Sequence, residues 1–289
     1  MGKYLATVRP NLDGTNTTTA YAQHDLLFDW SRFEIPKGEA CIKSMNIIWP
    51  GTNGTAGNAH DLTFFIARAV NGAAPPSLGT VNSVMNSGGA GAAKIGFAGS
   101  RNHIVYTRVV DVSAMATAAT YIQGYSILTD SLMNTIGGVQ SPAMDASAAQ
   151  PHFVNALQPG GVFIGNSTYA GNYNDSTSEP GMQSFWIAAI TNGAVDFGTG
   201  ITLNQAGDQA AVAKSTTSET TLTVADVDAD DILCVGDDLI AGNDGALIGK
   251  VTEVTSATSI KVDHVAEALE DDDEICVRNP IIFNFGIEY

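Results

Sequence analysis

The feature that most limits how this chain can fold is a period of two in its apolar residues. In "ACIKSMNIIWPG" (40–51), Cys41, Lys43, Met45 and Ile47 would lie on one face of an extended strand and the residues between them on the other. Similar runs, separated by turn-forming residues, stand at 24–38, 60–70, 101–112, 119–128, 160–169 and 184–193. Many short strands with turn signals between them predict an all-β chain, and we expect its main part to be a jelly-roll-like β-sandwich.

Two other stretches of this first part differ from the strand pattern. "DSLMNTIGG" (130–138) has the capping residues of one or two helical turns. The Gly, Ala, Ser and Asn residues of 71–96 predict a long loop. Because long loops in compact domains usually have a function, we expect this one to serve interaction.

The composition changes sharply at residue 205 and changes back after residue 278. This segment holds 17 of the chain's 30 acidic residues and 4 of its 13 basic residues, and no aromatic residue occurs between Phe197 and Phe283. Five strand-like runs lie within it, at 220–226, 236–242, 247–256, 258–265 and 273–279. The Asp244-Gly245 pair favours a hairpin turn. The segment is therefore predicted to be a small acidic β-barrel-like module.

After Asn279-Pro280 the aromatic character of the first part returns in "IIFNFGIEY". We interpret the acidic module as an insertion before the last strand. Residues 1–204 and 279–289 would form the β-sandwich, an assembly domain with an N-terminal arm. The chain would leave the sandwich through strand 197–204, and residues 205–278 would form the module. The alternative is a plain C-terminal domain whose own last strand is 281–289.

The overall charge excludes some classes of partner. The chain carries 30 acidic and 13 basic residues, a net charge of −17, and phosphate backbones would repel it. It has no run of 18 apolar residues, and its N-terminus lacks the apolar core of a signal peptide. We expect no nucleic-acid partner, no membrane span and no secretion signal.

The strongest metal candidate is "DVDADDILCVGD" (226–237). Asp226, Asp228, Asp230 and Asp237 occupy positions 1, 3, 5 and 12 of a calcium loop. However, Asp231 stands where the loop requires glycine, and strands flank the segment. A solvated acidic loop is therefore the alternative interpretation.

The five consecutive acids of 270–274 have two interpretations. Packed into a site, these carboxylates would need a cation or a proton to offset their repulsion. Exposed at a turn, they would keep a sheet edge from pairing with another chain, and we favour this role.

The sequence contains no nucleophile elbow and no pair of closely spaced histidines. His24 and His60 each precede an aspartate at the start of an apolar run, a pattern that favours turn chemistry at strand entry. We expect no catalytic residues and no cofactor, so the chain is predicted not to be an enzyme.

Cysteines and aromatic residues leave alternatives open. Cys234 and Cys276 are interpreted as small buried side chains in paired strands, with a disulfide as the alternative. Tyr169, Tyr173 and Trp186 would either pack inside the fold or form a platform for sugars.

Two stretches resemble virion structural proteins of tailed phages, particularly those of marine and cyanobacterial hosts. One is "LLFDWSRFEIPKGEACIKSMNIIWPGTNG" together with "DLTFFIARA". The other is "TTLTVADVDADDILCVGDDLIAGNDGALIGKVTEVTSATSIKVD", which is similar to the small β-modules of phage head, tail and fibre proteins. Together they cover about a third of the chain.

This resemblance implies a role in assembly, with no catalytic residues to transfer. The expectation is a capsid decoration (cement) protein in the virion, which binds the outer capsid lattice and stabilises the head. Its partners would be the major capsid protein or other virion proteins and further copies of itself, in a homotrimer. The alternative is a tail-fibre, head-fibre or adhesin-type module that recognises host-surface glycan.

Overall fold

A computed structural model of the 289-residue chain describes the residues listed at the end of this paragraph. Over these residues the chain is all-β, with three antiparallel sheets, so the prediction of fold class is confirmed at this level. No helix of the described part is long and apolar enough to cross a membrane. The described residues are 2–12, 20–37, 40–50, 62–70, 72–85, 99–110, 116–117, 122–128, 162–163, 180–195, 201–202, 215, 218–224, 233–241, 246–266, 268–269 and 273–289.

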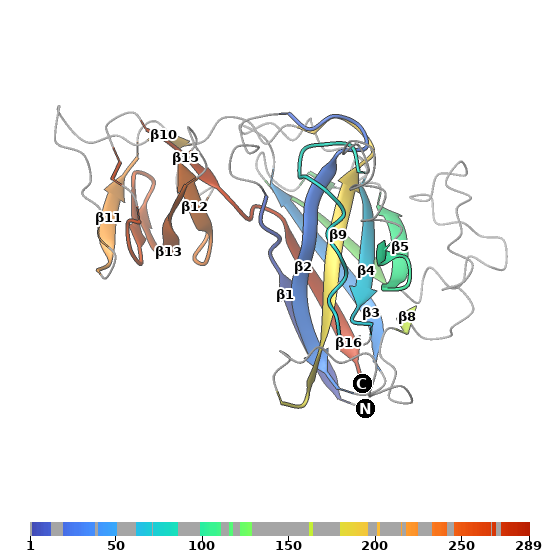
Figure 1. The fold of residues 1–289 in the computed structure, drawn as a ribbon. Coiled ribbons are helices and arrows are strands. Elements are labelled where there is room, and N and C mark those ends of the chain that lie inside the picture. The colour runs from blue at the N-terminus through green and yellow to red at the C-terminus, as the bar shows by residue number, and fades with distance from the viewer. Residues whose placement is uncertain are drawn as a thin grey trace.

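The first sheet places the first and last strands of the chain side by side. Its order is β1-β16-β3-β7-β6, with β8 also paired to β3. The strands are β1 (Lys3–Val8), β16 (Ile282–Glu288), β3 (Cys41–Pro50), β7 (Ile122–Leu128), β6 (Ala116–Thr117) and β8 (Val162–Phe163). The last strand therefore pairs with β1 and β3, and the two termini lie together at one end of the sheet (Figure 1).

The second sheet has the order β2-β9-β4-β5. Its strands are β2 (Leu26–Pro36), β9 (Met182–Thr191), β4 (Leu62–Arg68) and β5 (Ile104–Val110). The register between β4 and β9 runs without a shift over seven residue pairs, from Leu62 to Arg68. Between β2 and β9 the register shifts twice, between Leu26 and Phe28 and between Phe28 and Ser31.

One hydrophobic core joins these two sheets. Its buried members come from β1, β3 and β16 on one side and from β2, β4, β5 and β9 on the other. Phe283 of β16 is fully buried and contacts the rings of Phe28, Phe64 and Phe285 at centroid distances of 5.8, 6.3 and 6.3 Å. Phe285 in turn stacks on Phe33 at 5.2 Å. The last strand thus supplies the aromatic centre of the core.

The third sheet, of order β10-β15-β12-β13-β14-β11, has a core of its own. Its strands are β10 (Ile201–Thr202), β11 (Thr220–Thr223), β12 (Asp238–Ala241), β13 (Leu247–Ser256), β14 (Ser259–Val262) and β15 (Glu274–Val277). All five strands predicted within 205–278 are therefore present, and β12 and β13 pair as the predicted hairpin.

One predicted strand belongs to a different sheet. Ile201 and Thr202, expected in a strand of the sandwich, pair with Ile275 and Glu274 of β15 in the third sheet. Because alternating apolar residues do not specify which sheet a strand joins, the sequence pattern could not distinguish the two placements. The domain boundaries expected from composition stay a prediction.

Residues 72–85 cross the outer face of the second sheet, where they form a segment called here the strap (Figure 1). Leu78 of the strap is fully buried with Leu26, Phe65 and Ala188. The Trp30 indole N–H donates to the Pro76 carbonyl at 2.9 Å. This part of the long loop at 71–96 is therefore packed against the fold, and residues 86–98 lie outside the described part.

The alternation in β3 is partly as expected. Met45 and Ile47 are buried and Asn46 is exposed, but Ile42 is buried as well, although it was placed on the opposite face. The register shift between Gly286 and Ile287 of the neighbouring strand occurs next to Ile42 and changes which residues of β3 face the core.

The two cores predict two separable stability effects. Phe283→Ala removes a fully buried ring from the first core, and we expect it to cost about 3–5 kcal/mol of unfolding free energy. Ile260→Ala removes a fully buried side chain from the second core, at a cost of about 2–5 kcal/mol. Calorimetry should assign the two losses to two different unfolding transitions.

Thr221→Ala, at an exposed position of β11, is the control and should change stability by less than about 0.5 kcal/mol. If Phe283→Ala and Ile260→Ala equally lowered the temperature of one shared unfolding transition, the two cores would unfold as a single unit.

Candidate functional site: the cleft between β1 and β2

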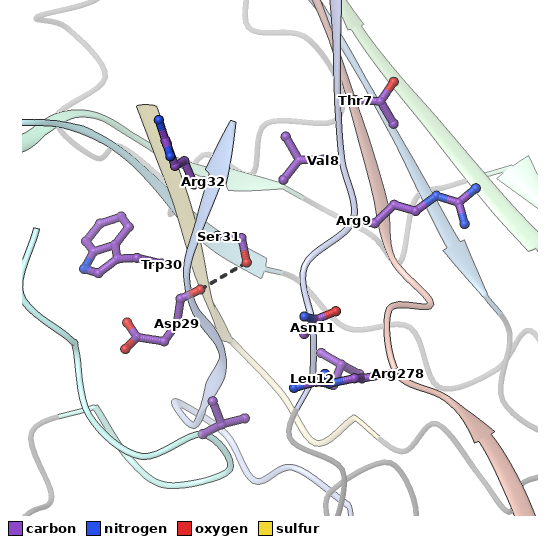
Figure 2. Close-up of a pocket in the computed structure, with 11 residues that line it drawn as sticks. Thr7, Val8, Arg9, Asn11, Leu12, Asp29, Trp30, Ser31, Arg32 and Arg278 are labelled. Carbon is purple, nitrogen blue, oxygen red and sulfur yellow. Dashed lines mark hydrogen bonds between the residues drawn. The ribbon is translucent and has the colours of Figure 1, made fainter. Parts of the chain in front are cut away.

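A cleft of about 680 Å³ lies between the end of β1 and the middle of β2 (Figure 2). Its lining is largely polar, and it includes three arginines and one aspartate: Arg9, Arg32, Arg278 and Asp29. In a chain with more than twice as many acidic as basic residues, this local excess of bases identifies the cleft as the candidate site.

Local backbone features open the cleft at this position. β1 and β2 are edge strands of their respective sheets. β1 ends at Val8, and the following Pro10 has no N–H with which to continue a ladder. On the other side, the register shift between Phe28 and Ser31 bends β2. The two edges therefore diverge where Arg9 and Ser31 lie.

Arg9 connects the end of β1 to the turn before β12 of the third sheet. Its Nη1 donates to Asp237 Oδ1 at 2.7 Å, and the Asp237 side chain is only 8% exposed. The other Asp237 oxygen accepts the Cys234 backbone N–H at 2.7 Å. The Leu12 N–H also donates to the Arg278 carbonyl at 2.7 Å. This segment thus holds the end of β1 against the turn before β12 and the residue that follows β15.

The turn before β12 brings the Asp237 carboxylate to Arg9. Gly236 has φ of 96°, a conformation that L side chains rarely adopt, and a Cβ at this position would lie 3.6 Å from the Arg9 guanidinium. Burial raises the pKa of Asp237, although the Cys234 N–H and Arg9 both act to lower it. Partial desolvation, together with the negative charge of Asp237, also raises the pKa of the Cys234 thiol. The ion pair therefore costs desolvation energy that Arg9 only partly offsets.

On the β2 side the polar side chains are held by the fold. Arg32 Nε and Nη2 donate to Ser184 Oγ at 3.0 and 2.8 Å, and Nη2 also donates to Glu34 Oε1 at 2.6 Å. Asp29 Oδ1 accepts the Leu78 N–H of the strap at 3.0 Å. The Ser31 hydroxyl donates to the Asp29 carbonyl at 3.4 Å (Figure 2). These hydrogen bonds hold the polar side chains on the β2 side of the cleft in place.

Arg278 differs from the other two arginines. Arg9 is paired with Asp237 and Arg32 with Glu34, whereas the Arg278 side chain is half-buried and forms no ion pair with the residues that the structure describes. Figure 2 shows Arg278 beside Leu12, while the Arg9 side chain extends away from β2. Among the described residues, Arg278 is therefore the guanidinium of this cleft that has no carboxylate partner.

The predicted calcium residues are only partly described. Asp226, Asp228 and Asp230 lie outside the described residues, so the calcium site stays a prediction. Asp237 is described, and the cation that it contacts is the Arg9 guanidinium. Within the described ranges, no group of three or more His, Cys, Asp or Glu side chains is arranged to hold a metal ion.

Of the acids 270–274, which were predicted to keep a sheet edge from pairing, the structure describes only Asp273 and Glu274. Residues 270–272 lie outside the described part, and Glu274 is in β15, paired with Thr202 of β10. β15 lies between β10 and β12, so the edge of the third sheet on this side is the two-residue strand β10. The role of the acids 270–274 stays a prediction.

Cys234 and Cys276 were both interpreted as buried strand residues, and the structure agrees for only one of them. Cys276 is buried in β15 as expected, but Cys234 is exposed in the turn before β12, and within the described residues neither forms a disulfide. The expectation of two buried strand cysteines is therefore wrong for Cys234. Its apolar neighbours suggested a strand, but the tight turn at Gly236 interrupts the run.

Trp186 is a packing residue. It lies in β9, is 5% exposed, and packs with Trp30, Ala67 and Ala69, so it is not part of a sugar platform. Tyr169 and Tyr173 lie outside the described residues. His24 has φ of 72° in a turn, and the next residue, Asp25, accepts the Ala22 N–H, which confirms turn chemistry at this strand entry.

A scan of protein-family models finds none that matches the chain, and a search of curated proteins finds no match either. What the chain can do is therefore inferred from its own residues.

The cleft itself was missed by sequence reasoning. Arg9 and Asp237 are 228 positions apart, and Arg32 and Ser184 are 152 positions apart. No local pattern connects such residues. The one available signal was the break in composition at Asn279-Pro280, which lies next to Arg278.

The raised pKa of Asp237 predicts how the stability of the fold depends on pH. Because the pKa of Asp237 is raised, the folded chain binds its proton at a higher pH than the unfolded chain. The contribution of this group to stability therefore falls as pH rises through and above about 4, the ordinary pKa of an aspartate. We expect Asp237→Asn to remove this decline. Because the Arg9 side chain is 26% exposed, the substitution should change stability at neutral pH by no more than about 1 kcal/mol. Urea unfolding across this pH range measures both effects.

Arg9→Gln should be more damaging than Asp237→Asn, since it leaves a buried carboxylate without its cation. We expect a loss of about 1–3 kcal/mol at neutral pH and a decline that extends to higher pH. Arg101→Gln, at an exposed arginine, is the matched control. Equal losses for Arg9→Gln and Asp237→Asn would contradict this account.

The calcium hypothesis has a direct test. Because Arg9 already provides the positive charge at Asp237, we expect a calcium chelator to leave the melting temperature unchanged. A melt of the full chain with added Ca²⁺ and with chelator measures this. A chelator-dependent decrease that Asp226→Asn abolishes would instead support the predicted site.

Proposed function

We propose that the chain is a virion structural protein, most specifically a capsid decoration protein, whose two packed sheets form a jelly-roll sandwich. The observation that carries the proposal is the order of the eight long strands of these sheets. Numbered along the chain, β1, β2, β3, β4, β5, β7, β9 and β16 are strands 1 to 8, and the two sheets have the orders 1-8-3-6 and 2-7-4-5.

This order supports a jelly roll on topological grounds. The first four strands alternate between the sheets, and strand 8 returns beside strand 1, as two Greek keys wrapped around one core require. Jelly rolls form the shells of many viruses and also occur in lectins. The fold is therefore compatible with both expected functions, and the sequence resemblance favours the virion.

The position of the third sheet in the chain favours a decoration role. It is inserted between strands 7 and 8 of the proposed jelly roll, has its own core, and lies beside the two packed sheets (Figure 1). Most of the acidic excess lies in residues 205–278, which hold 17 of the 30 acids. In this proposal the sandwich binds the capsid lattice or its own copies, and the barrel-like acidic module faces solvent.

The deciding experiment is to locate the protein in the virus particle that contains it. A reconstruction of wild-type particles should show copies of the protein on the outer capsid lattice. Particles that lack the protein should release their genome at a lower temperature. Density on the tail together with specific retention on a glycan array would support the fibre or adhesin alternative. Absence from purified particles would reject both.

The homotrimer is a separate part of the proposal. Light scattering of the purified chain should give a mass near three times 30.1 kDa. A monomer that remains monomeric on the particle would reject the trimer without affecting the location on the capsid.

A further inference from the structure

The hydrogen-bond alternation of β1 shows which of its backbone groups are unused. Gly2 and Tyr289 exchange both backbone hydrogen bonds, at 2.7 and 3.1 Å, and the register from there to Val8 has no shift. In an antiparallel ladder such pairs alternate with pairs that do not bond each other. The N–H and C=O groups of Lys3, Leu5 and Thr7 therefore point away from β16, toward the free edge of the sheet.

This edge is accessible. In the described part of the chain β16 is the only strand paired with β1. The side chains of Lys3, Leu5 and Thr7 are exposed, and that of Leu5 is 65% exposed. Proteins usually protect an edge of this kind with prolines, bulges or several charges. β1 has one lysine, no proline and no bulge, so none of these devices protects its edge, and no strand of the described part occupies it.

The cleft extends this edge. Thr7, the last of the three outward-facing residues, also lines the cleft, and the lining continues through Arg9 and Asn11 to Arg278. A segment that pairs with β1 would therefore run directly into the cleft. Since Arg9 and Arg32 already have carboxylate partners, the charge that the fold leaves for this segment is the Arg278 guanidinium.

We propose that β1 is a docking edge for an extended peptide segment of a partner protein, which adds to the sheet as a strand and places one carboxylate in the cleft against Arg278. Main-chain hydrogen bonds to Lys3, Leu5 and Thr7 hold the segment, as in other cases of strand addition. The Arg278 guanidinium selects an acidic side chain. This inference rests on the geometry of β1 and the cleft, and it is independent of whether the protein is part of a virion.

The probe is a capped, fluorescent octapeptide of alternating valine and threonine in which a single glutamate is moved through the sequence, with glutamine as the matched substitution. Anisotropy with the full chain should show tighter binding for one glutamate position than for its glutamine counterpart. Arg278→Gln should reduce the affinity of that peptide to the level of the glutamine peptide, and Arg101→Gln should have no effect.

Proline substitution tests the backbone contacts. Leu5→Pro removes an N–H that faces the free edge and none that bonds to β16, so β1 remains paired while the peptide loses a hydrogen bond. We expect at least about a tenfold loss of affinity for Leu5→Pro and a smaller loss for Leu5→Ala, which keeps the N–H.

A measurement on the unchanged chain removes any dependence on how the variants fold. Bound peptide should slow amide hydrogen exchange at Lys3, Leu5 and Thr7, with little change at Tyr4 and Ala6, whose N–H groups already face β16. If glutamate is favoured at no position, or exchange at the three outward-facing amides is unchanged, the proposal is wrong. A dimer of the chain that Leu5→Pro dissociates would also overturn it, in favour of a second copy on this edge.

Discussion

The placement of β16 between β1 and β3 is the constraint on which the rest of the structure depends. Phe283 and Phe285 of this strand fill the centre of the core between the two packed sheets. They are added only after the chain has passed through the third sheet. Because a strand in the middle of a sheet uses both of its backbone edges, neither β1 nor β3 would be fully paired without it. The third sheet must therefore end close to the first, since β15 is followed directly by β16.

The placement of β16 also explains where the first sheet contacts the third sheet. The chain leaves the third sheet at Arg278, which the Leu12 N–H contacts just beyond the end of β1, while Arg9 contacts Asp237 in the turn before β12. The outer face of the second sheet is covered by the strap, whereas no strand of the described part pairs with the outer edge of β1. The free edge of β1 and Arg278 thus lie next to the same cleft, where the end of β1 separates from β2.

Much of the fold could be predicted from the sequence, and little of the site. Alternating runs correctly indicated β2, β3, β4 and β5, and the acidic segment contains each of its five predicted strands. The burial of Ile42, the exposure of Cys234 and the sheet to which Ile201 belongs were predicted incorrectly. These three depend on a register shift, a tight turn and a choice of pairing partner, none of which changes the local pattern of residue types.

The sequence by itself determined that the chain is all-β, that an acidic segment free of aromatic residues interrupts it, and that its last residues share the aromatic character of the first part. These properties follow from the side-chain period and from composition, which act within a few residues. Only the tertiary structure decided which strands pair, that Arg9 meets Asp237, and which backbone groups of β1 remain unused. Those outcomes depend on hydrogen bonds and charges that join residues more than two hundred positions apart.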